Sequence, residues 1–229
     1  MFSPRGPSLR ELCVQALSSV ERGYDLLAPK FDHTPFRTPS SLLDATATYV
    51  SGLGPFGKGL DVCCGTGAGL SVLRDLCPDG ITGVDFSAGM LAQAGQACPE
   101  ATLVRADARD LPFDGEFDLA VSFGALGHFL PSERPALFAG VHRALRPGGV
   151  FALPLGEAPP VTSPWHWATL GFDTAMRLRN AVIRPPFVMY YRTTPVAAVQ
   201  RDLTAAGFTV TVAVLPEPRC RLLIARKLP

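Results

Sequence analysis

The chain has 229 residues, 47% of them hydrophobic and 18% charged, and a formal net charge of +1. This much apolar material can bury a sizeable core, which excludes a disordered chain. The near-neutral charge argues against a general polyanion binder, so we expect no nucleic-acid partner. The length suits one α/β domain with additions. Because no Ser/Gly-rich or charge-rich linker divides the sequence, we expect a single domain over residues 1–229.

The six cysteines are expected to be reduced thiols. None of them forms a Cys-x-x-Cys pair, and Cys63 and Cys64 are adjacent, where a disulfide ring is strained. The beginning of the sequence lacks the continuous apolar segment of a secretory signal, and no stretch approaches about 18 apolar residues. These features predict a cytoplasmic protein without a membrane partner.

Apolar residues recur at helical spacing over residues 8–28. Prolines then indicate a loop, and Ser40 or Ser41 is expected to cap a second helix that ends near Val50. From Gly59 onward, short apolar runs alternate with helical patterns, which predicts right-handed crossovers and a mainly parallel sheet covered on both faces. The expected strands are 59–64, 80–85, 101–107, 117–123 and 149–155, and the expected helices are 68–76, 87–97 and 132–145.

This alternation of strand and helix patterns is interrupted at residues 155–193, which contain both tryptophans and several prolines. A helix near 195–206 and two short strands joined by "PEPR" follow, and the short connection predicts a hairpin. We therefore expect a Rossmann-like, doubly wound, mainly parallel seven-stranded sheet with a C-terminal antiparallel hairpin. The expected parts are an N-terminal helical cap (1–50), a cofactor-binding core (51–154), an inserted acceptor cap (155–193) and a C-terminal helix and hairpin (194–229).

The stretch "LDVCCGTGAGL", residues 60–70, places Gly65, Gly67 and Gly69 directly after an apolar strand. A strand that enters a glycine-rich turn and then a helix presents free backbone N–H groups to a ligand at the carboxyl edge of the sheet. A plain strand–helix turn needs only one glycine. Dinucleotide-binding turns need the spacing G-x-G-x-x-G, and here the third glycine comes one residue early. Asp61 before the turn suits a cationic group better than a pyrophosphate.

The stretch resembles motif I of the class I S-adenosylmethionine-dependent methyltransferases, in which an acidic residue precedes G-x-G-T-G. Cys63 stands where the first glycine of the family is typical, and we expect a tighter packing constraint there rather than loss of the site. The resemblance implies that S-adenosylmethionine is the cofactor. It also implies cofactor contacts from Asp61, Cys63, Gly65, Thr66 and Gly67.

Further segments resemble later motifs of the same family, in the same order. "GVDFSAGML" (83–91) resembles the second motif, in which Asp85 binds the ribose hydroxyls and Phe86 and Met90 flank the cofactor. Asp85 could instead serve only the start of the next helix, and Met90 could be a core residue. "RADARDLPF" (105–113) implies that Asp107 and the backbone of Ala108 bind the adenine.

Two more segments complete the resemblance. "FDLAVSFGALGHF" (117–129) implies that Ser122 and Phe123 lie beside the methionine part of the cofactor, and "LRPGGVFALPL" (145–155) resembles a structural turn into the fifth strand. Upstream, "YDLLAPKFD" (24–32) resembles the segment that covers the cofactor in many small-molecule members. It implies a contact from Tyr24, although a helix end packed on the sheet would look the same.

Methyl transfer is an in-line displacement from a sulfonium carbon, and the protein mainly has to align the nucleophile and exclude water. A base is needed only when the acceptor loses a proton. His128, in the loop after the fourth strand, is the candidate catalytic residue, although a lone histidine often only caps a loop. No cluster of His, Cys and Asp has metal-ligand spacing, so we expect no metal.

Acceptor recognition is expected from residues 1–45 and 155–193. The second segment offers an aromatic surface that suits either a pocket for a small, partly apolar molecule or a dimer contact, so a monomer and a homodimer both stay open. Its residues are Trp165, Trp167, Phe172, Phe187, Met189, Tyr190 and Tyr191. The expected function is therefore methyl transfer to a small molecule. The alternatives are an NAD(P)-dependent oxidoreductase, disfavoured by the glycine spacing and by the lack of Tyr-x-x-x-Lys, and a protein that binds S-adenosylmethionine without turnover.

Overall fold

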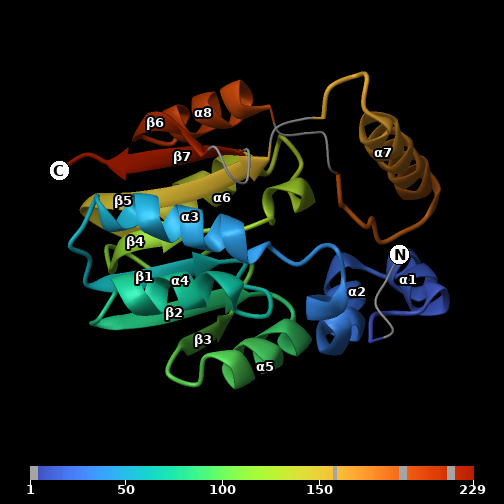
Figure 1. Cartoon of the computed structure of the whole chain (residues 1–229), viewed down its shortest axis with the longest axis horizontal. Helices are drawn as coiled ribbons and strands as arrows, with labels where there is room; N and C mark the ends of the chain where they lie inside the picture. Colours follow the sequence, from blue (N-terminus) through green and yellow to red (C-terminus); the bar gives the residue numbers. More distant parts are fainter. Residues whose placement is uncertain (1–4, 157–158, 191–194, 216–219) are drawn as a thin grey trace.

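The computed structural model describes residues 5–156, 159–190, 195–215 and 220–229. Within these residues, seven strands form one sheet in the order β3-β2-β1-β4-β5-β7-β6 (Figure 1). The first five pair in parallel, and β7 runs antiparallel to both β5 and β6. The strands are β1 Lys58–Val62, β2 Gly80–Asp85, β3 Thr102–Arg105, β4 Phe117–Val121, β5 Leu145–Gly156, β6 Phe208–Leu215 and β7 Cys220–Lys227. The expected fold class is confirmed, including the C-terminal hairpin, whose connection at 216–219 lies outside the described residues.

Helices cover both faces of the sheet because its strands are apolar on both sides. On one face α3 (Ser40–Ser51), α4 (Ala68–Leu76) and α5 (Ala88–Ala97) bury apolar side chains against the strands. On the other face α6 (Arg134–Ala144) and α8 (Val196–Ala205) do the same. Figure 1 shows the sheet between these two layers. Parallel strands connected by such helices all end at one edge, which is where a ligand site is expected.

Three local expectations are corrected. The helical pattern of 8–28 is divided into α1 (Leu9–Leu17) and α2 (Val20–Leu27), because the Ser19 side chain caps α2 by accepting from the backbone N–H of Arg22 at 3.2 Å. Helix α3 begins at Ser40 after Pro39, and neither Ser40 nor Ser41 caps it. The fifth strand starts at Leu145 rather than at Gly149. It includes the residues "RPGG", where the register of its pairing with β4 shifts.

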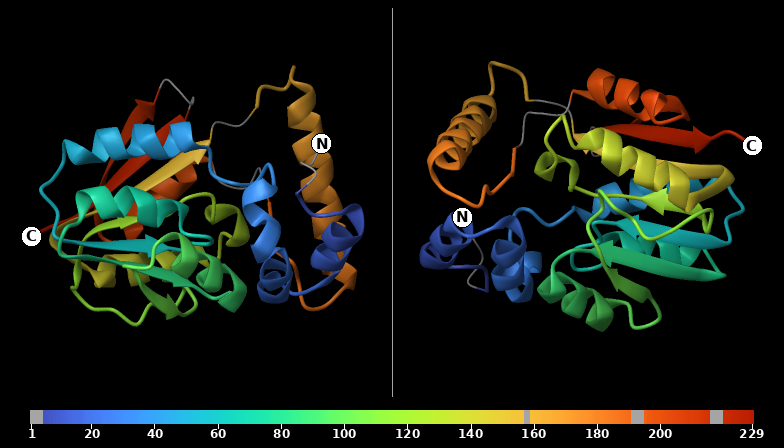
Figure 2. Two further views of the ribbon diagram at one scale, coloured as in Figure 1. Left: turned by 60° about the horizontal axis from the view of Figure 1, so that its bottom comes forward. Right: turned by 180° about the vertical axis from the view of Figure 1, so that it is seen from behind.

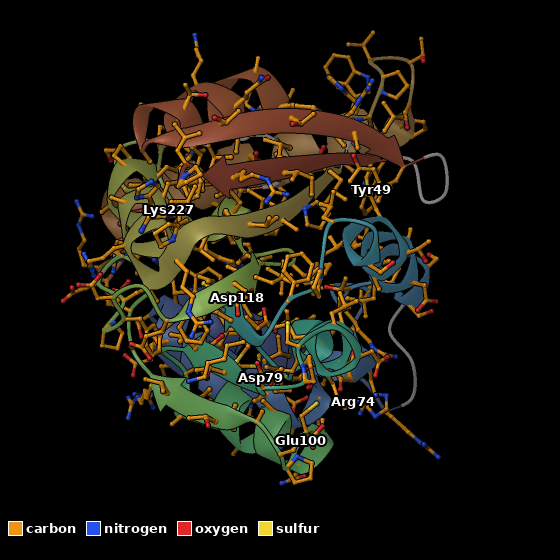
Figure 3. All side chains as sticks on the ribbon, turned by 90° about the vertical axis from the view of Figure 1, so that its left-hand side faces the viewer. Tyr49, Arg74, Asp79, Glu100, Asp118 and Lys227 are labelled. Atoms are coloured by element: carbon orange, nitrogen blue, oxygen red, sulfur yellow. The ribbon has the colours of Figure 1, made fainter. Side chains whose placement is uncertain are left out.

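The edge of the sheet where the parallel strands begin is occupied by structural contacts (Figure 3). Asp118 accepts from the backbone N–H groups of Gly57 and Lys58 and pairs with Arg146. The Lys227 ammonium donates to the carbonyl of Leu145 at 2.7 Å. These groups are already paired within the fold, so this edge offers no argument for a ligand site.

A separate group of helices lies beyond the opposite edge, where the parallel strands end (Figure 2). It consists of α1, α2, the 3₁₀ helix η1 (Ala28–His33) and α7 (Pro164–Val182). Buried side chains of α7 and of the following segment pack with α2 in a small core of their own. This core contains Met176, Phe187 and Tyr190, with Val20, Tyr24, Leu130, Phe172, Val188 and Met189 packed against it. The prediction that 155–193 is helical in part is confirmed for its described residues.

Candidate functional site

Asp61 lies in β1 near the carboxyl edge and is 1% exposed. The backbone N–H groups of Gly69 and Leu70 donate to its carboxylate, but its Oδ2 has no hydrogen-bond partner among the described residues. Burial, and to a smaller extent the nearby carboxylate of Asp85, raises the pKa of Asp61 to about 8. A buried carboxylate oxygen without a partner is costly, so this atom fits a cationic ligand group such as an ammonium.

The three glycines of the turn are required for three different reasons. At Gly69, a Cβ would come within 2.5 Å of Asp61 Oδ2, so this glycine makes room for the carboxylate. Gly67 caps α4 in the left-handed region with φ +96°. Gly65 also has positive φ, and no protein atom lies within 4 Å of a Cβ placed there. The space over Gly65 is therefore open to a ligand, whereas Gly69 serves the interior of the protein.

Cys63 adopts φ +59°, a left-handed conformation that costs a non-glycine residue about 1–2 kcal/mol. Its side chain is half-buried and packs against the core on the α6 face of the sheet. The expected packing constraint is therefore accompanied by backbone strain that glycine would avoid. Burial raises the pKa of the Cys63 thiol well above its usual range, and the carboxylates of Asp85 and Asp61 act in the same direction.

Asp85, at the end of β2, holds the glycine turn in place. Its Oδ2 accepts from the backbone N–H of Gly65 at 2.9 Å, and its Oδ1 accepts from that of Ser87 at 2.9 Å. Burial raises the pKa of Asp85, while these hydrogen bonds oppose the shift. Ser87 itself caps α5 by accepting from the N–H of Met90 at 3.1 Å. Asp85 thus organises both turns of the site, and its contact with a ribose remains a prediction.

Two carboxylates of the segment "YDLLAPKFD" attach the N-terminal helices to these turns. Asp25 Oδ1 accepts from Ser87 Oγ at 2.6 Å and from the backbone N–H of Gly89 at 2.9 Å. Asp32 Oδ1 accepts from Thr66 Oγ1 at 2.8 Å. Sequence reasoning selected only Tyr24 in this segment and missed both aspartates. Their signal was the repeat of Asp in the segment, which by itself does not say where the carboxylates bind.

Tyr24 and His128 are hydrogen-bonded, with 2.8 Å between Tyr24 Oη and His128 Nε2. The other ring nitrogen, Nδ1, lies 2.7 Å from the carbonyl of Val188. A carbonyl can only accept, so Nδ1 carries the proton and Nε2 accepts from the tyrosine hydroxyl. Burial lowers the pKa of His128, although the bond to Val188 opposes the shift. The imidazole is therefore neutral at pH 7, and its unprotonated nitrogen, Nε2, faces the hydroxyl of Tyr24.

The segment after α7 holds the His128 loop from the other side. The backbone N–H of Tyr190 donates to the carbonyl of Gly127 at 2.9 Å, and a Cβ at Gly127 would come within 2.6 Å of the Tyr190 carbonyl oxygen. Asn180 of α7 accepts from the N–H of Phe187 at 2.8 Å and donates to its carbonyl at 3.0 Å. Phe187 in turn stacks on Tyr24 with 6.4 Å between ring centres.

The remaining predicted cofactor residues lie in or near the same edge. Asp107 is exposed and accepts from Arg109 Nε at 2.9 Å, and this bond lowers the pKa of Asp107. Met90 is 1% exposed, as a core residue is, and Phe86 is half-buried. The other three, Ala108, Ser122 and Phe123, are buried. Their contacts with a cofactor remain predictions.

The aromatic residues expected to contact the acceptor form two groups in the structure, one buried and one exposed. Phe187 and Tyr190 are buried in the small core under α7, whereas Trp165 and Trp167 are exposed. The indole Nε1 of Trp167 donates to the carbonyl of Val161 at 3.0 Å. Tyr191 lies outside the described residues. In the described part of the chain, no group of three or more His, Cys, Asp or Glu side chains could hold a metal ion.

Comparison with known proteins agrees with this geometry. Residues 60–149 match the family model of a methyltransferase domain. An uncharacterized methyltransferase of Synechocystis sp. is 41% identical over 102 residues, which are 44% of this chain and 48% of that protein. A phthiotriol/phenolphthiotriol dimycocerosates methyltransferase of Mycobacterium leprae is 42% identical over 122 residues, 52% of this chain and 44% of that protein. The matched segments thus span less than half the length of these curated relatives.

Solved structures share the fold over a longer range. DhpI in its complex with SAH superposes with a TM-score of 0.68, at 20% identity, over 97% of this chain and 100% of that chain. A putative O-methyltransferase from Nostoc punctiforme superposes with a TM-score of 0.65, at 19% identity, over 92% of this chain and 62% of that chain. The fold is therefore that of the Rossmann-like methyltransferases. Residues 60–149 are thus similar to a methyltransferase domain, and the fold around them agrees with that similarity.

Proposed function

We propose that the protein transfers the methyl group of S-adenosylmethionine to a small, partly apolar molecule by in-line displacement. The observation that carries the proposal is that buried Asp61, whose Oδ2 has no hydrogen-bond partner among the described residues, lies in the strand that leads into the turn with open space over Gly65. A carboxylate favours the ammonium of the cofactor, and an uncovered glycine lets a ligand lie against the backbone.

In this proposal, Asp85 binds the ribose, Asp107 and Ala108 bind the adenine, and Thr66 and Gly67 line the turn. The side chains of Cys63, Phe86, Met90, Ser122 and Phe123 complete the cofactor site. When bound, the cofactor supplies a methyl sulfonium. The hydrogen bonds that Asp25 and Asp32 accept from the turns of the site hold α2 and η1 beside it and so help to exclude water.

Tyr24 and His128 supply a route for a proton. Tyr24 Oη donates to His128 Nε2, so Oη can accept a proton from an acceptor hydroxyl while its own proton passes to the imidazole. This arrangement supports a nucleophile that loses a proton as the methyl group is transferred, such as a hydroxyl group. Half-buried apolar side chains next to Tyr24, such as Met189, whose Sδ lies 3.9 Å from Tyr24 Oη, support an acceptor with apolar parts. The lipid named for the mycobacterial relatives is consistent with that class.

Release of S-adenosylhomocysteine tests the function. The purified protein is incubated with S-adenosylmethionine and a panel of hydroxylated small molecules of increasing apolar area, and product is quantified by mass spectrometry. Turnover with a hydroxylated apolar compound, lost in Asp61→Asn but kept in Asp79→Asn at the opposite edge, is the expected result. Binding of S-adenosylhomocysteine without turnover of any acceptor would favour a cofactor-binding protein, and tighter binding of NADH would favour an oxidoreductase.

A further inference from the structure

Exposed apolar side chains are concentrated on the helices beyond the carboxyl edge of the sheet. Large hydrophobic residues with high exposure are common there, whereas the rest of the described chain shows few, such as Tyr49, Val214 and Leu228. The exposed ones in this region are Val14, Leu17, Leu26, Val161, Trp165, Trp167, Leu170, Leu178 and Val182. An exposed apolar area of this kind marks an interaction surface.

Helix α7 carries exposed apolar side chains on the face opposite its buried stripe. Its inward stripe, spaced by three and four residues, consists of His166, Thr169, Asp173 and Met176, all of which are buried. Its outward face carries Trp167, Leu178 and Val182, which are 62%, 67% and 83% exposed. The outward face of a helix on the surface of a globular protein is normally polar. The outward apolar face therefore requires a partner other than the core of this chain.

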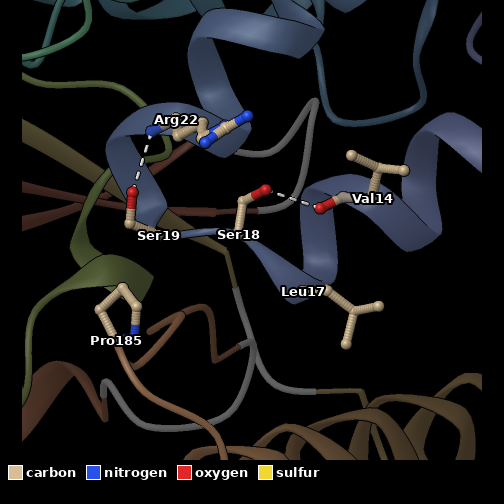
Figure 4. Close-up of a pocket in the computed structure, with 6 residues that line it drawn as sticks. All are labelled: Val14, Leu17, Ser18, Ser19, Arg22 and Pro185. Atoms are coloured by element: carbon tan, nitrogen blue, oxygen red, sulfur yellow. Dashed lines mark hydrogen bonds between the residues drawn. The ribbon is translucent and has the colours of Figure 1, made fainter.

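The apolar surface continues onto α1. Arg179 at the end of α7 donates to the carbonyl of Ser18 at 3.0 Å, which joins the C-terminal ends of the two helices. A hollow of about 370 Å³ lies at this junction (Figure 4). Its lining combines apolar groups with one guanidinium and consists of Val14, Leu17, Ser18, Ser19, Arg22 and Pro185.

The charge around this surface is positive. Arg10, Arg22 and Arg184 are exposed, and none of them has an ion pair within the described part of the chain. The exposed carboxylate of α1, Glu11, is already paired with Lys30 at 2.6 Å. The acidic residue of α7, Asp173, is buried on the inward face. The surface thus complements a negatively charged partner.

We propose that the outward face of α7, with the adjoining part of α1, binds the surface of an anionic lipid bilayer. Exposed tryptophans beside apolar residues and arginines are typical of segments that lie in the membrane interface. A second copy of the chain on a two-fold axis would place these arginines against one another, which disfavours self-association through this face.

Among the described residues no helix is long and apolar enough to cross a membrane. The sequence expectation of no membrane partner was based on the lack of a long apolar run, which a helix lying on the surface does not need. The proposal is independent of the methyl acceptor and of turnover.

Intrinsic fluorescence tests the proposal directly, because Trp165 and Trp167 are the two tryptophans of the chain and both lie on α7. The protein is mixed with vesicles of phosphatidylcholine alone or with phosphatidylglycerol. We expect a blue shift of the emission, and quenching by brominated lipids, only with the anionic vesicles. Added salt should weaken this binding, because it screens the arginines.

Variants locate the contact. The double substitution Leu178→Asp with Val182→Asp should abolish vesicle binding, while Val214→Asp on β6, a matched exposed apolar position, should leave it unchanged. Arg22→Glu and Arg184→Glu should each weaken binding to anionic vesicles by about fivefold or more. Unchanged binding of S-adenosylhomocysteine and an unchanged circular dichroism spectrum confirm that the variants fold.

Three outcomes would overturn the proposal. The first is no binding to anionic vesicles. The second is equal binding by the wild type and by the Leu178/Val182 variant. The third is a concentration-dependent dimer in sedimentation that the same double variant dissociates, since the surface would then belong to a second copy.

Discussion

The carboxylate of Asp61 occupies the space that a side chain at Gly69 would need, since a Cβ there would come within 2.5 Å of Oδ2. The two residues lie in successive elements, Asp61 in β1 and Gly69 in α4. This contact lets the buried carboxylate accept from the first turn of α4, whose N–H groups lack helical partners.

Gly69→Ala tests this relationship, and Gly171→Ala provides the control. Alanine in place of an exposed helical glycine normally stabilises a protein by up to about 1 kcal/mol. Gly171 in α7 has open space around it, so its substitution should be neutral or stabilising. Gly69→Ala should destabilise by about 1–3 kcal/mol and weaken cofactor binding, because Asp61 must move. Urea denaturation and calorimetry measure both effects, and equal stability of the two variants would contradict the prediction.

Gly65→Val should abolish binding of S-adenosylhomocysteine while the fold persists. The branched side chain fills the open space over the turn, and φ +53° adds a strain of about 1–2 kcal/mol. Gly115→Val is a matched control, because Gly115 has φ +63° and is equally open but lies in the loop before β4. The control should show the same loss of stability with normal binding. Binding by Gly65→Val within a few-fold of the wild type would remove this turn from the site.

Asp61 should make the ligand-free protein less stable as pH rises. The folded-state pKa is about 8, above the value near 4 of an unfolded chain, so the folded state holds the proton more tightly. The contribution of Asp61 to the free energy of unfolding is therefore complete below about pH 4 and is lost as the pH rises toward 8. Asp61→Asn should remove this pH dependence and weaken S-adenosylhomocysteine binding. Denaturation at pH 5 and pH 8 checks the prediction, which fails if both proteins lose stability equally.

Tyr24→Phe should lower the methyl transfer rate by about 10²–10⁴-fold with nearly unchanged cofactor affinity, because it removes the hydroxyl that donates to His128 and keeps the ring. His128→Ala should have a similar effect, and His142→Ala, a half-buried histidine packed on Phe208, should not. Since burial lowers the pKa of His128, wild-type activity should persist at neutral pH and decline only below the usual histidine range. Losses under about tenfold would assign Tyr24 and His128 a structural role.

The sequence alone predicted the sheet, because strands buried on both faces and the crossover helices between them leave strong local patterns. Residues 68–76 and 80–85 match α4 and β2 at both ends. The spacing of Asp61, Gly65 and Asp85 also located the turns of the candidate site. The hydrophobic pattern did not predict where a helix is interrupted. At Ser19 the side chain caps the start of α2 and so divides residues 8–28 into two helices.

Tertiary structure decided which partners these residues have. Gly69 is a glycine because of Asp61, Asp25 binds the start of α5, and His128 lies between Tyr24 and Val188, which are far apart in the sequence. The same holds for α7, whose composition suggested either a pocket or a dimer contact, and the packing leaves Trp165 and Trp167 exposed. A hydrophobic pattern specifies that a face needs a partner, but only the packing of the whole chain determines whether that partner lies inside the protein.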